Sequence, residues 1–484
     1  MEPRNEAWRE ELRQSMKPKE RMAIERVKMN ELAGDYRNKN SEEVNQGLTA
    51  EQALLESHRC LDCPNPSCMT GCPVSINIPT FIKNIERGEV LEAAKVLKQT
   101  SSLPAVCGRV CPQERQCESQ CIHTKSGHQA VAIGYLERFA SDYERNSGNI
   151  ALPTVAPANG IKIAVVGSGP CGLSFAGDMA KYGYDVTVFE ALHEIGGVLK
   201  YGIPEYRLPN EVVDTEIENL KKIGVHFITD CIVSKTITID ELKAEGFRAV
   251  FVASGAGLPN FMNIPGENLI GVMSSNEYLT RVNLMGAARD EMDTPVFKGK
   301  RVAVIGGGNT AMDSVRTAKR LGAERAMIIY RRSEEEMPAR REEIKHAKEE
   351  GVEFLNLHNP IEYKGDDKGR VCSMTLQKMA LGEPDASGRR KPEPIPGGIE
   401  TIEVDEVIVS VGVSPNPLIP RSVEGLEVSR KGTIVVGDES MQSSIPTLFA
   451  GGDIVRGGAT VILAMGDGRK AAASMHAKIA AGEI

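Results

Sequence analysis

The stretch that decides the fold is residues 161–172, which read IKIAVVGSGPCG. The apolar, mostly β-branched run at its start is typical of a buried strand, and the glycines after it lead into a helical pattern. A strand, a glycine-rich turn and a helix in this order form the phosphate-binding part of a Rossmann unit. A second copy, RVAVIGGGNTA, occupies residues 301–311, so the sequence predicts two dinucleotide-binding domains.

Each glycine of this pattern has its own physical task. The first allows the tight turn, the second lets the backbone approach a pyrophosphate, and the third lets the helix pack closely on the strand. The helix N-terminus then faces the anion. In the second copy an alanine replaces the third glycine, which the pattern tolerates. The predicted phosphate-binding residues are Gly167, Gly169, Pro170 and Gly172 in the first copy and Gly306, Gly308, Asn309, Thr310 and Ala311 in the second.

The two copies differ at the end of their second strand. Glu190 ends that strand in the first copy, where a carboxylate accepts hydrogen bonds from a ribose diol. Arg331 and Arg332 stand there in the second copy, and arginines suit a 2′-phosphate, so NADPH is favoured over NADH. The alternative is that they are surface cations paired with the acidic run at 334–336. With NADPH at the second site, FAD is the expected ligand of the first.

Later segments support a flavin site. The strands at 250–255 and 407–412 end in small residues that let the backbone approach a cofactor closely. Asp453 is expected to bind a ribityl hydroxyl, the alternative being a turn or helix-capping aspartate. A final helix then begins at Thr460, with its N-terminus toward the flavin. The further residues expected at the cofactors are Gly197, Val198, Arg207, Ser254, Gly255, Gly452, Asp453 and Thr460.

We predict no catalytic side chain, because hydride transfer between NADPH and a flavin is carried out by the cofactors themselves. No C-x-x-C motif lies near the flavin segments, which argues against a dithiol mechanism like that of thioredoxin reductase.

Two cysteine clusters precede the Rossmann units. The first is C-x2-C-x4-C-x3-C-P, from Cys60 to Cys72. The second is C-x3-C-P from Cys107, and it continues to Cys117 and Cys121. Such spacing suits cuboidal iron–sulfur clusters, so we expect two clusters with ligands exchanged between the two runs. Structural zinc is the alternative, but only Cys60 and Cys63 form the paired knuckle that zinc sites usually show.

Length and composition limit the other possibilities. A chain of 484 residues is long enough for roughly three domains, and its net charge of −8 argues against nucleic acid as a partner. No apolar run is long enough to span a membrane and no signal peptide is visible, so a cytoplasmic location is expected. The predicted divisions are a charged extension at 1–45, an α-helical iron–sulfur domain at 46–150, a first part of the FAD domain at 155–285, an NADPH domain at 286–405 and a second part of the FAD domain at 406–484. The extension is expected to be an exposed helix or a flexible arm.

Three longer strings resemble a known family. They are CGRVCPQE at 107–114, GIPE with RLP at 202–209, and YRRSEEEMP at 330–338. They resemble the small (beta) subunit of NADPH-dependent glutamate synthase. They are also similar to the N-terminal half of dihydropyrimidine dehydrogenase and to the large subunit of electron-bifurcating NADH-dependent ferredoxin:NADP oxidoreductase. The resemblance covers roughly residues 45–480.

The resemblance implies a ligand set for each 4Fe–4S cluster. One cluster takes Cys60, Cys63, Cys68 and Cys121. The other takes Cys72, Cys111 and Cys117, and its fourth ligand is Glu137, at the position where dihydropyrimidine dehydrogenase has a glutamine. Cys107 is then a thiol that binds no iron. The alternative for Glu137 is an ion pair with Arg138 or a nearby lysine on a helix surface.

The resemblance also implies a function. The chain is expected to oxidise NADPH and to pass electrons through FAD and two 4Fe–4S clusters to a partner, the glutamate synthase large subunit. No stretch is left for a barrel that binds FMN and 2-oxoglutarate, so the chain supplies only reducing equivalents. One alternative is the bifurcating oxidoreductase, whose partner is a ferredoxin-reductase-like small subunit. Others are a stand-alone NADPH:quinone or sulfide-linked reductase and a non-catalytic scaffold with zinc-bound cysteines.

Overall fold

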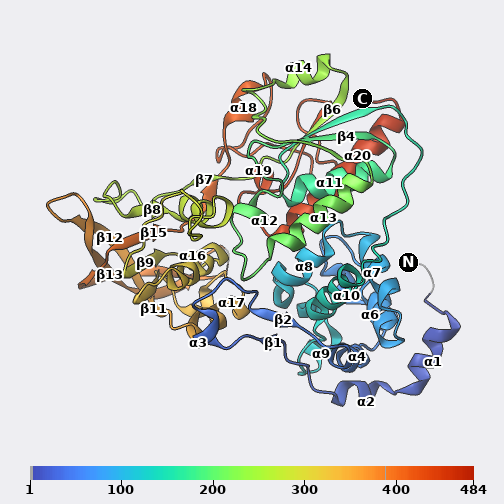
Figure 1. The fold of residues 1–484 in the computed structure, drawn as a ribbon, viewed down its shortest axis with the longest axis horizontal. Helices are drawn as coiled ribbons and strands as arrows, with labels where there is room; N and C mark the ends of the chain where they lie inside the picture. The colour runs from blue at the N-terminus through green and yellow to red at the C-terminus, as the bar shows by residue number, and fades with distance from the viewer. Residues whose placement is uncertain (1–3, 387) are drawn as a thin grey trace.

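The computed structural model describes residues 4–386 and 388–484 and contains a helical domain and two Rossmann-type units (Figure 1). The helical domain lies against both units at the lower right of the view, and the chain between residues 162 and 484 forms the units. The predicted α/β class with a helical domain at its N-terminal side is therefore confirmed. Within the described residues, no helix combines the length and the apolar character that a membrane crossing requires.

The first unit is built on a parallel sheet in the order β17-β6-β3-β4-β5. Its central strand is fully buried at Ile163 and Val165, as its β-branched run predicts. Helices α11 and α20 pack together at this sheet, and the ring of Phe175 on α11 stacks on Phe251 of β6 at 4.1 Å. The strands are β3 (Lys162–Val166), β4 (Asp185–Phe189), β5 (His226–Ile228), β6 (Phe247–Val252) and β17 (Leu448–Ala450), and the helices are α11 (Pro170–Lys181), α12 (Val198–Tyr201), α13 (Asn210–Lys222), α14 (Ile239–Ala244), α18 (Leu418–Ser422), α19 (Asp453–Arg456) and α20 (Val461–Ala480).

The second unit has a parallel sheet in the order β11-β10-β9-β15-β8. It takes β8 from before residue 286 and β15 from after residue 405, so the unit extends beyond the predicted range of 286–405 at both ends. The first half of the segment at 407–412, expected at the flavin, forms part of β15 of this second sheet. The strands are β8 (Val272–Ser274), β9 (Arg301–Ile305), β10 (Arg325–Tyr330), β11 (Glu353–Asn356) and β15 (Glu406–Val409), and the helices are α15 (Ser275–Leu279), α16 (Asn309–Arg320) and α17 (Arg341–Glu349).

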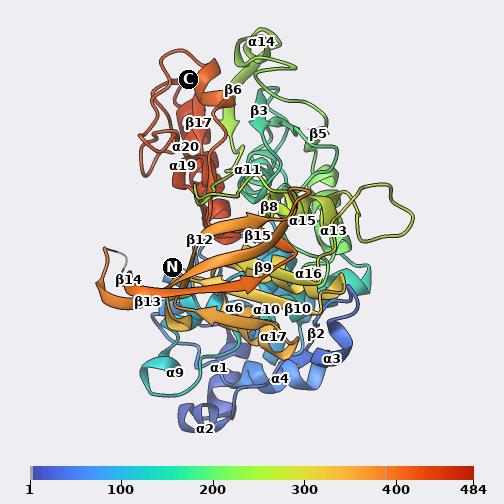
Figure 2. The ribbon, with the colours of Figure 1, turned by 90° about the vertical axis from the view of Figure 1, so that its left-hand side faces the viewer.

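Small antiparallel sheets complete the second unit. Strands β12 (His358–Gly365), β13 (Val371–Pro384) and β14 (Arg390–Glu403) form one of them, and Figure 2 shows the β13–β14 hairpin projecting from the body. Strands β7 (Leu258–Pro259) and β16 (Val413–Ser414) form another. They run alongside each other where the chain passes between the two units.

The cysteine-bearing domain is helical, as the sequence predicts. Residues 78–98 of this domain form two helices, separated at Gly88, whose φ of +85° lies in the left-handed region. The last helix ends at Gly148, also left-handed, and the segment that follows has no regular structure as far as residue 161. The helices are α4 (Ala50–His58), α5 (Ser67–Thr70), α6 (Ile78–Glu86), α7 (Val90–Lys98), α8 (Pro104–Val110), α9 (Ile122–Lys125) and α10 (Ile133–Ser147).

The N-terminal extension is packed against the protein, so the expectation of an exposed or flexible arm is wrong for the described residues from 4 onward. Helices α1 (Ala7–Ser15) and α2 (Pro18–Ala23) lie on the helical domain, whereas β1 (Asn30–Glu31), α3 (Gly34–Arg37) and β2 (Asn45–Gly47) run toward α17 (Figure 1). Arg9, Arg21 and Arg37 are buried because each meets a buried carboxylate. From the sequence alone a charge-rich stretch is expected to be solvated, because the sequence does not identify its buried partners.

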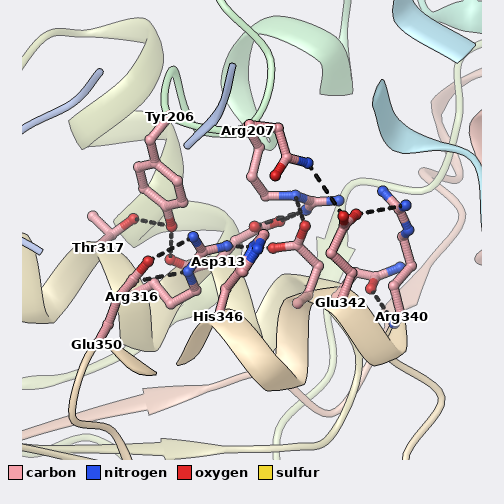
Figure 3. A network of polar contacts seen from close by, with 12 residues as sticks. Tyr206, Arg207, Asp313, Arg316, Thr317, Arg340, Glu342, His346 and Glu350 are labelled. Atoms are coloured by element: carbon pink, nitrogen blue, oxygen red, sulfur yellow. Dashed lines mark hydrogen bonds and ion pairs between the residues drawn. The ribbon is translucent and has the colours of Figure 1, made fainter. Parts of the chain in front are cut away.

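A buried polar network joins the parts of the molecule (Figure 3). Arg207, from the first unit, donates to both carboxylate oxygens of Asp313 on α16, at 2.7 and 2.6 Å. Its Nε lies 3.2 Å from the Glu343 carboxylate on α17, which also pairs with Arg316. Because these groups are buried and come from both Rossmann units, the network fixes one unit against the other.

The same network reaches the other two parts of the chain. Arg37 of the N-terminal extension donates to Glu350 at 2.9 Å. Arg340 donates to the Arg109 carbonyl oxygen of the helical domain at 2.6 Å and to Gln113 at 3.1 Å. The N-terminal extension, the helical domain and both Rossmann units therefore meet at α17.

We predict that Glu343→Gln destabilises the protein by about 3–5 kcal/mol at pH 7, because Arg207 and Arg316, both buried, each lose one of their two carboxylate partners. Burial alone would raise the pKa of Glu343, but Arg207 and Arg316 hold it at about 2, below its usual 4.5. The carboxylate therefore contributes stability that is complete above pH 4.5 and is lost as the pH falls toward 2. Urea unfolding at several pH values measures the difference between variant and parent, which should shrink in acid.

The matched control is Glu349→Gln, which removes a carboxylate from the same helix. The Glu349 side chain is 39% exposed and pairs with Arg37, so the expected loss is below about 1 kcal/mol. Equal losses for both variants would contradict the role given to the buried network.

Candidate cofactor and cluster sites

One cavity of about 1040 Å³ connects the parts of the protein. Glycine-loop residues of both Rossmann units line it, and so do Val110 and Pro112 of the helical domain. These last two residues flank Cys111, a predicted cluster ligand. Of the predicted cofactor residues, the cavity is lined by Gly167, Gly169, Pro170, Glu190, Gly197, Val198, Arg207, Ser254, Gly255, Asn309, Thr310, Asp453 and Thr460.

The first glycine loop has the backbone geometry that a dinucleotide requires. Gly167 has a φ of +99°, and a Cβ on Gly172 would lie 2.0 Å from the Gly167 oxygen. Gly172 is therefore required for packing of α11 against the loop and does not line the cavity. A Cβ on Gly169 would meet no atom within 4 Å, so the space beside it is open to a ligand. Gly197 approaches this loop, since its Cβ would lie 2.9 Å from the Gly169 Cα.

The predicted ribose-binding carboxylate is held in place by the loop itself. Glu190 accepts hydrogen bonds from the Ser168 amide at 2.9 Å and the Ser168 hydroxyl at 2.6 Å, and its other oxygen accepts from Leu192 at 2.9 Å. A carboxylate oxygen accepts more than one hydrogen bond, so Glu190 keeps capacity for a diol.

At the flavin end, Asp453 begins α19 and Thr460 caps α20. Burial raises the pKa of Asp453 to about 6, and Asp467 adds to the shift. The Asp453 carboxylate accepts a hydrogen bond from the Ala459 amide at 3.0 Å. Gly452 does not line the cavity; its amide donates to Asp467 at 3.0 Å, which fixes the turn before Asp453.

In the second unit, Gly306 and Ala311 serve packing. A Cβ on Gly306 would lie 2.3 Å from the Ser410 oxygen, and Ala311 is fully buried. Gly308 has open space beside it, with only a Pro338 carbon at 4.0 Å from a Cβ. Asn309 accepts a hydrogen bond from the Arg340 amide at 2.9 Å, so the buried network orients this loop.

The three predicted cofactor-binding arginines have different surroundings. Arg331 is exposed beyond the end of β10. Arg332 is buried and donates to Asp385 at 2.6 Å and to the Arg390 oxygen at 2.8 Å, so it is held by the β13–β14 hairpin. Among the described residues, neither Arg331 nor Arg332 pairs with the acidic run at 334–336, which instead pairs with Lys348 and Arg390. Arg207 lines the cavity, but its guanidinium is bound to Asp313 and Glu343.

The four cysteines predicted for one cluster line a single small cavity in the helical domain. Apolar side chains of Ile78, Ile82, Val131 and Ile133 surround it. A set of four thiols in an otherwise apolar pocket fits an iron–sulfur cluster. Cys63 and Cys68 are partly exposed, so this site lies near the surface. The four cysteines are Cys60, Cys63, Cys68 and Cys121.

The residues predicted for the other cluster lie deeper and close together. Burial raises the pKa of Cys72 to about 11 and that of Cys117 well above its usual 9, and the Glu137 carboxylate adds to both shifts. A hydrogen bond to Cys107, together with burial, raises the pKa of Cys111, and Glu137 contributes there too. Glu137 therefore lies near enough to all three of its predicted co-ligands to raise the pKa of each.

Glu137 fits the role of fourth ligand. Its side chain is buried, its pKa is raised to about 8 by burial and by Glu216, and its Oε1 lacks a hydrogen-bond partner among the described residues. Arg138 pairs with Glu43 and Asp142, so the alternative of a surface ion pair with Glu137 is wrong. A buried carboxylate oxygen without a partner is costly unless something binds it.

Sequence reasoning missed residues that position these sites. Asp313, Arg340 and Asp467 position the loops. Each is one polar residue within or directly before a helix, and a single polar residue forms no motif that the sequence would show. Val110 and Pro112 were not predicted to reach the cofactor cavity, although the Cys-Pro pair marked the turn. The signal for Asp467 is its place in a mainly apolar helix, where a fully buried carboxylate requires partners.

Comparison with known proteins agrees with this geometry. A family described as dihydropyrimidine dehydrogenase domain II, 4Fe-4S cluster, matches residues 37–149. A family described as pyridine nucleotide-disulphide oxidoreductase matches residues 161–468. The glutamate synthase (NADPH) small chain of Halomonas elongata is 37% identical over 436 residues, covering 89% of this chain and 91% of that protein.

The chain belongs to the glutamate synthase small-chain family. The predicted resemblance is thereby confirmed. A relative with another name, the NADPH-Fe(3+) oxidoreductase subunit beta of Geobacter sulfurreducens, is also 37% identical, over 450 residues that cover 88% of this chain and 65% of that protein. Among solved structures, Mycobacterium tuberculosis FprA in complex with NADPH shares the fold, with a TM-score of 0.56 and 20% identity over 67% of this chain and 86% of that one.

We predict that Gly169→Ala weakens FAD binding at least about tenfold and leaves the fold intact, because the new methyl group projects into open space where the pyrophosphate would lie. The matched variant is Gly308→Ala, at the same position of the second loop, which should weaken NADPH and spare FAD. Flavin content after purification and titration of each nucleotide measure both effects. Loss of the same nucleotide in both variants would contradict the assignment of the two loops.

Proposed function

We propose that this protein oxidises NADPH and delivers the electrons one at a time to a partner subunit through two 4Fe–4S clusters. When bound, FAD converts hydride chemistry into single electrons, and iron–sulfur clusters carry single electrons. The observation that carries the proposal is the cavity lined by both glycine loops and by the neighbours of Cys111. A nicotinamide, a flavin and a cluster could all be brought together only at such a junction.

The packing supports an order for the two clusters. Cys72 and Cys111 belong to the buried set, and their neighbours pack on the flavin-binding unit. A Cβ on Gly466 of α20 would lie 3.0 Å from the Pro73 oxygen, and the Cys107 sulfur lies 3.5 Å from that of Met465. The set with Cys63 and Cys68 is partly exposed. We infer that electrons enter at the buried cluster and leave from the exposed one.

The partner is proposed to be a second redox subunit. Relatives are named as a small chain or a subunit beta, which implies assembly with another chain. The large subunit of glutamate synthase is the first candidate, and a ferredoxin-reductase-like subunit is the second. The many free cysteines favour a reducing compartment, so we place the complex in the cytoplasm.

The decisive experiment is anaerobic addition of NADPH to the purified protein, followed by visible and electron paramagnetic resonance spectra. Bleaching of a flavin band and the appearance of two cluster signals are expected. A protein without flavin, or with zinc in place of iron, would overturn the proposal. An anaerobic pull-down with mass spectrometry then separates a large glutaminase-containing partner from a small flavin-containing one.

We predict that Arg331→Ala lowers kcat/KM for NADPH about tenfold or more and changes that for NADH little. A charge-assisted hydrogen bond of the kind proposed for the 2′-phosphate contributes about 1.5–3 kcal/mol. Steady-state reduction of an artificial acceptor with each nucleotide measures the ratio. Arg325→Ala, at the opposite end of β10 where Arg325 pairs with Glu353, is the control and should leave that ratio unchanged. Equal losses for the two nucleotides would count against the 2′-phosphate site.

We predict that Glu137→Ala leaves the buried cluster labile and retains FAD, because it removes one of four ligands without touching the flavin cavity. Iron analysis and cluster spectra should show the loss of one cluster signal. Glu144→Ala removes another buried carboxylate from the same helix, one that pairs with Lys98, and should preserve both signals. Unchanged iron content in the Glu137 variant would contradict ligation by this residue.

A further inference from the structure

The turn between Cys60 and Cys63 carries a buried carboxylate that pairs with three arginines of the N-terminal extension. Asp62 is fully buried at its side chain and has a φ of +50°, so the cysteine loop fixes its position. Arg9 donates to it at 2.8 Å, Arg13 at 2.7 and 3.0 Å, and Arg4 at 3.2 Å. Arg4 also donates to the carbonyl oxygens of Cys63 and Pro64.

These contacts put an excess of positive charge on one side of the exposed cluster site. Asp62 is the fully buried carboxylate that the three guanidiniums share. Glu6 and Glu10 also pair with Arg9 and Arg13, but they are 44% and 52% exposed, so water screens their negative charge. Lys83 adds a further cation, because its ammonium donates to the Cys60 carbonyl oxygen at 2.7 Å while it pairs with Glu86. Low exposure makes the charge effective: Arg9 is fully buried and the Arg4 side chain is 9% exposed.

The buried cluster site has different surroundings. Its proposed fourth ligand is a carboxylate, Glu137, whose Oε1 has neither a hydrogen-bond nor an ion-pair partner among the described residues. Glu118, beside Cys117, is balanced by Arg26 at 2.8 Å. Local charge is one of the factors that set the potential of an iron–sulfur cluster, and positive charge favours the reduced, more negative form.

We propose that Arg4, Arg9 and Arg13 are positioning residues of the electron-transfer path, which raise the reduction potential of the cluster at Cys60, Cys63, Cys68 and Cys121 above that of the buried one. The N-terminal extension thereby favours the reduced state of the exposed cluster, which holds the electron until it is transferred to the partner. This inference rests on the proposed function, because it requires a cluster at each site.

The arrangement also provides a built-in reporter. Trp8, the single tryptophan of the sequence, lies on α1 between these arginines, and the Arg87 guanidinium of the helical domain stacks over its ring at 4.2 Å. Its fluorescence therefore reports whether α1 is docked on the cluster domain.

The test is a redox titration of the purified, cluster-loaded protein, followed by electron paramagnetic resonance, for the parent and for Arg4→Gln with Arg13→Gln. We expect the reduction equilibrium of the exposed cluster to fall about tenfold, which is 59 mV for one electron, while the buried cluster keeps its potential. Arg13→Gln alone should give a smaller fall, and it serves if the double variant does not fold, because the Arg13 side chain is 33% exposed. Arg13→Lys, which keeps the charge, should restore most of the parent value.

The matched control is Lys19→Gln, which removes a positive charge from the exposed face of the same extension and should leave both potentials unchanged. An unaltered potential of the exposed cluster in the double variant, with the Trp8 emission of the parent, would overturn the inference. So would a fall of the same size in the Lys19 variant or in the Arg13→Lys variant. Failure of the proposed function is distinguishable, since the parent itself would then lack one cluster signal or would not be reduced by NADPH.

Discussion

Arg207 extends from the first Rossmann unit and binds two carboxylates of the second, Asp313 and Glu343. Both Arg207 and Asp313 also line the cavity that the two units share. A cofactor site assembled from two units requires their relative position to be fixed, because a displacement of about 1 Å is enough to cost much of the rate of a transfer reaction. The cavity thus depends on this buried contact, which belongs to the network in Figure 3.

Burial of so many charges is stable only as a network. Desolvation of an isolated carboxylate or guanidinium is costly, and the cost is offset only when every charge is paired and hydrogen-bonded. Arginine suits this role because its planar fork binds two partners at once. Arg316 illustrates the point, since it is fully buried and donates to Glu343 and to both oxygens of Glu350. The low pKa of Glu343 and the raised pKa of Asp313, about 6 where burial outweighs Arg207, are two results of the same balance.

Local pattern predicted the fold class, both glycine loops and the helical cysteine domain, since each depends on short-range sequence. Gly167 and Gly172 could be predicted because only glycine fits there. A Cβ would lie 2.6 Å from the Ala253 oxygen at Gly167 and 2.0 Å from the Gly167 oxygen at Gly172. The pairing of strands that are far apart in the sequence could not be predicted. β15 and the strands of the first sheet have the same apolar pattern, and nothing local assigns β15 to β9. The buried arginines were missed for a related reason, because Arg9 and Asp62 are 53 residues apart and only the folded chain shows them as partners.

The N-terminal extension connects the exposed cluster site with the buried network at α17. Its first half binds the turn of the exposed cluster through Asp62, and its second half binds α17 through Arg37 and Glu350. The exposed cluster site and the second Rossmann unit are therefore tied by one continuous segment, in addition to the contacts of the helical domain itself. A ligand that shifts a two-state element must interact differently with its two positions. NADPH at the second unit would influence the cluster turn only if binding moved α17, and the full burial of Glu350 and Arg316 opposes such movement. In our proposal the extension therefore acts as a fixed electrostatic element of the electron path, with no need for a conformational switch.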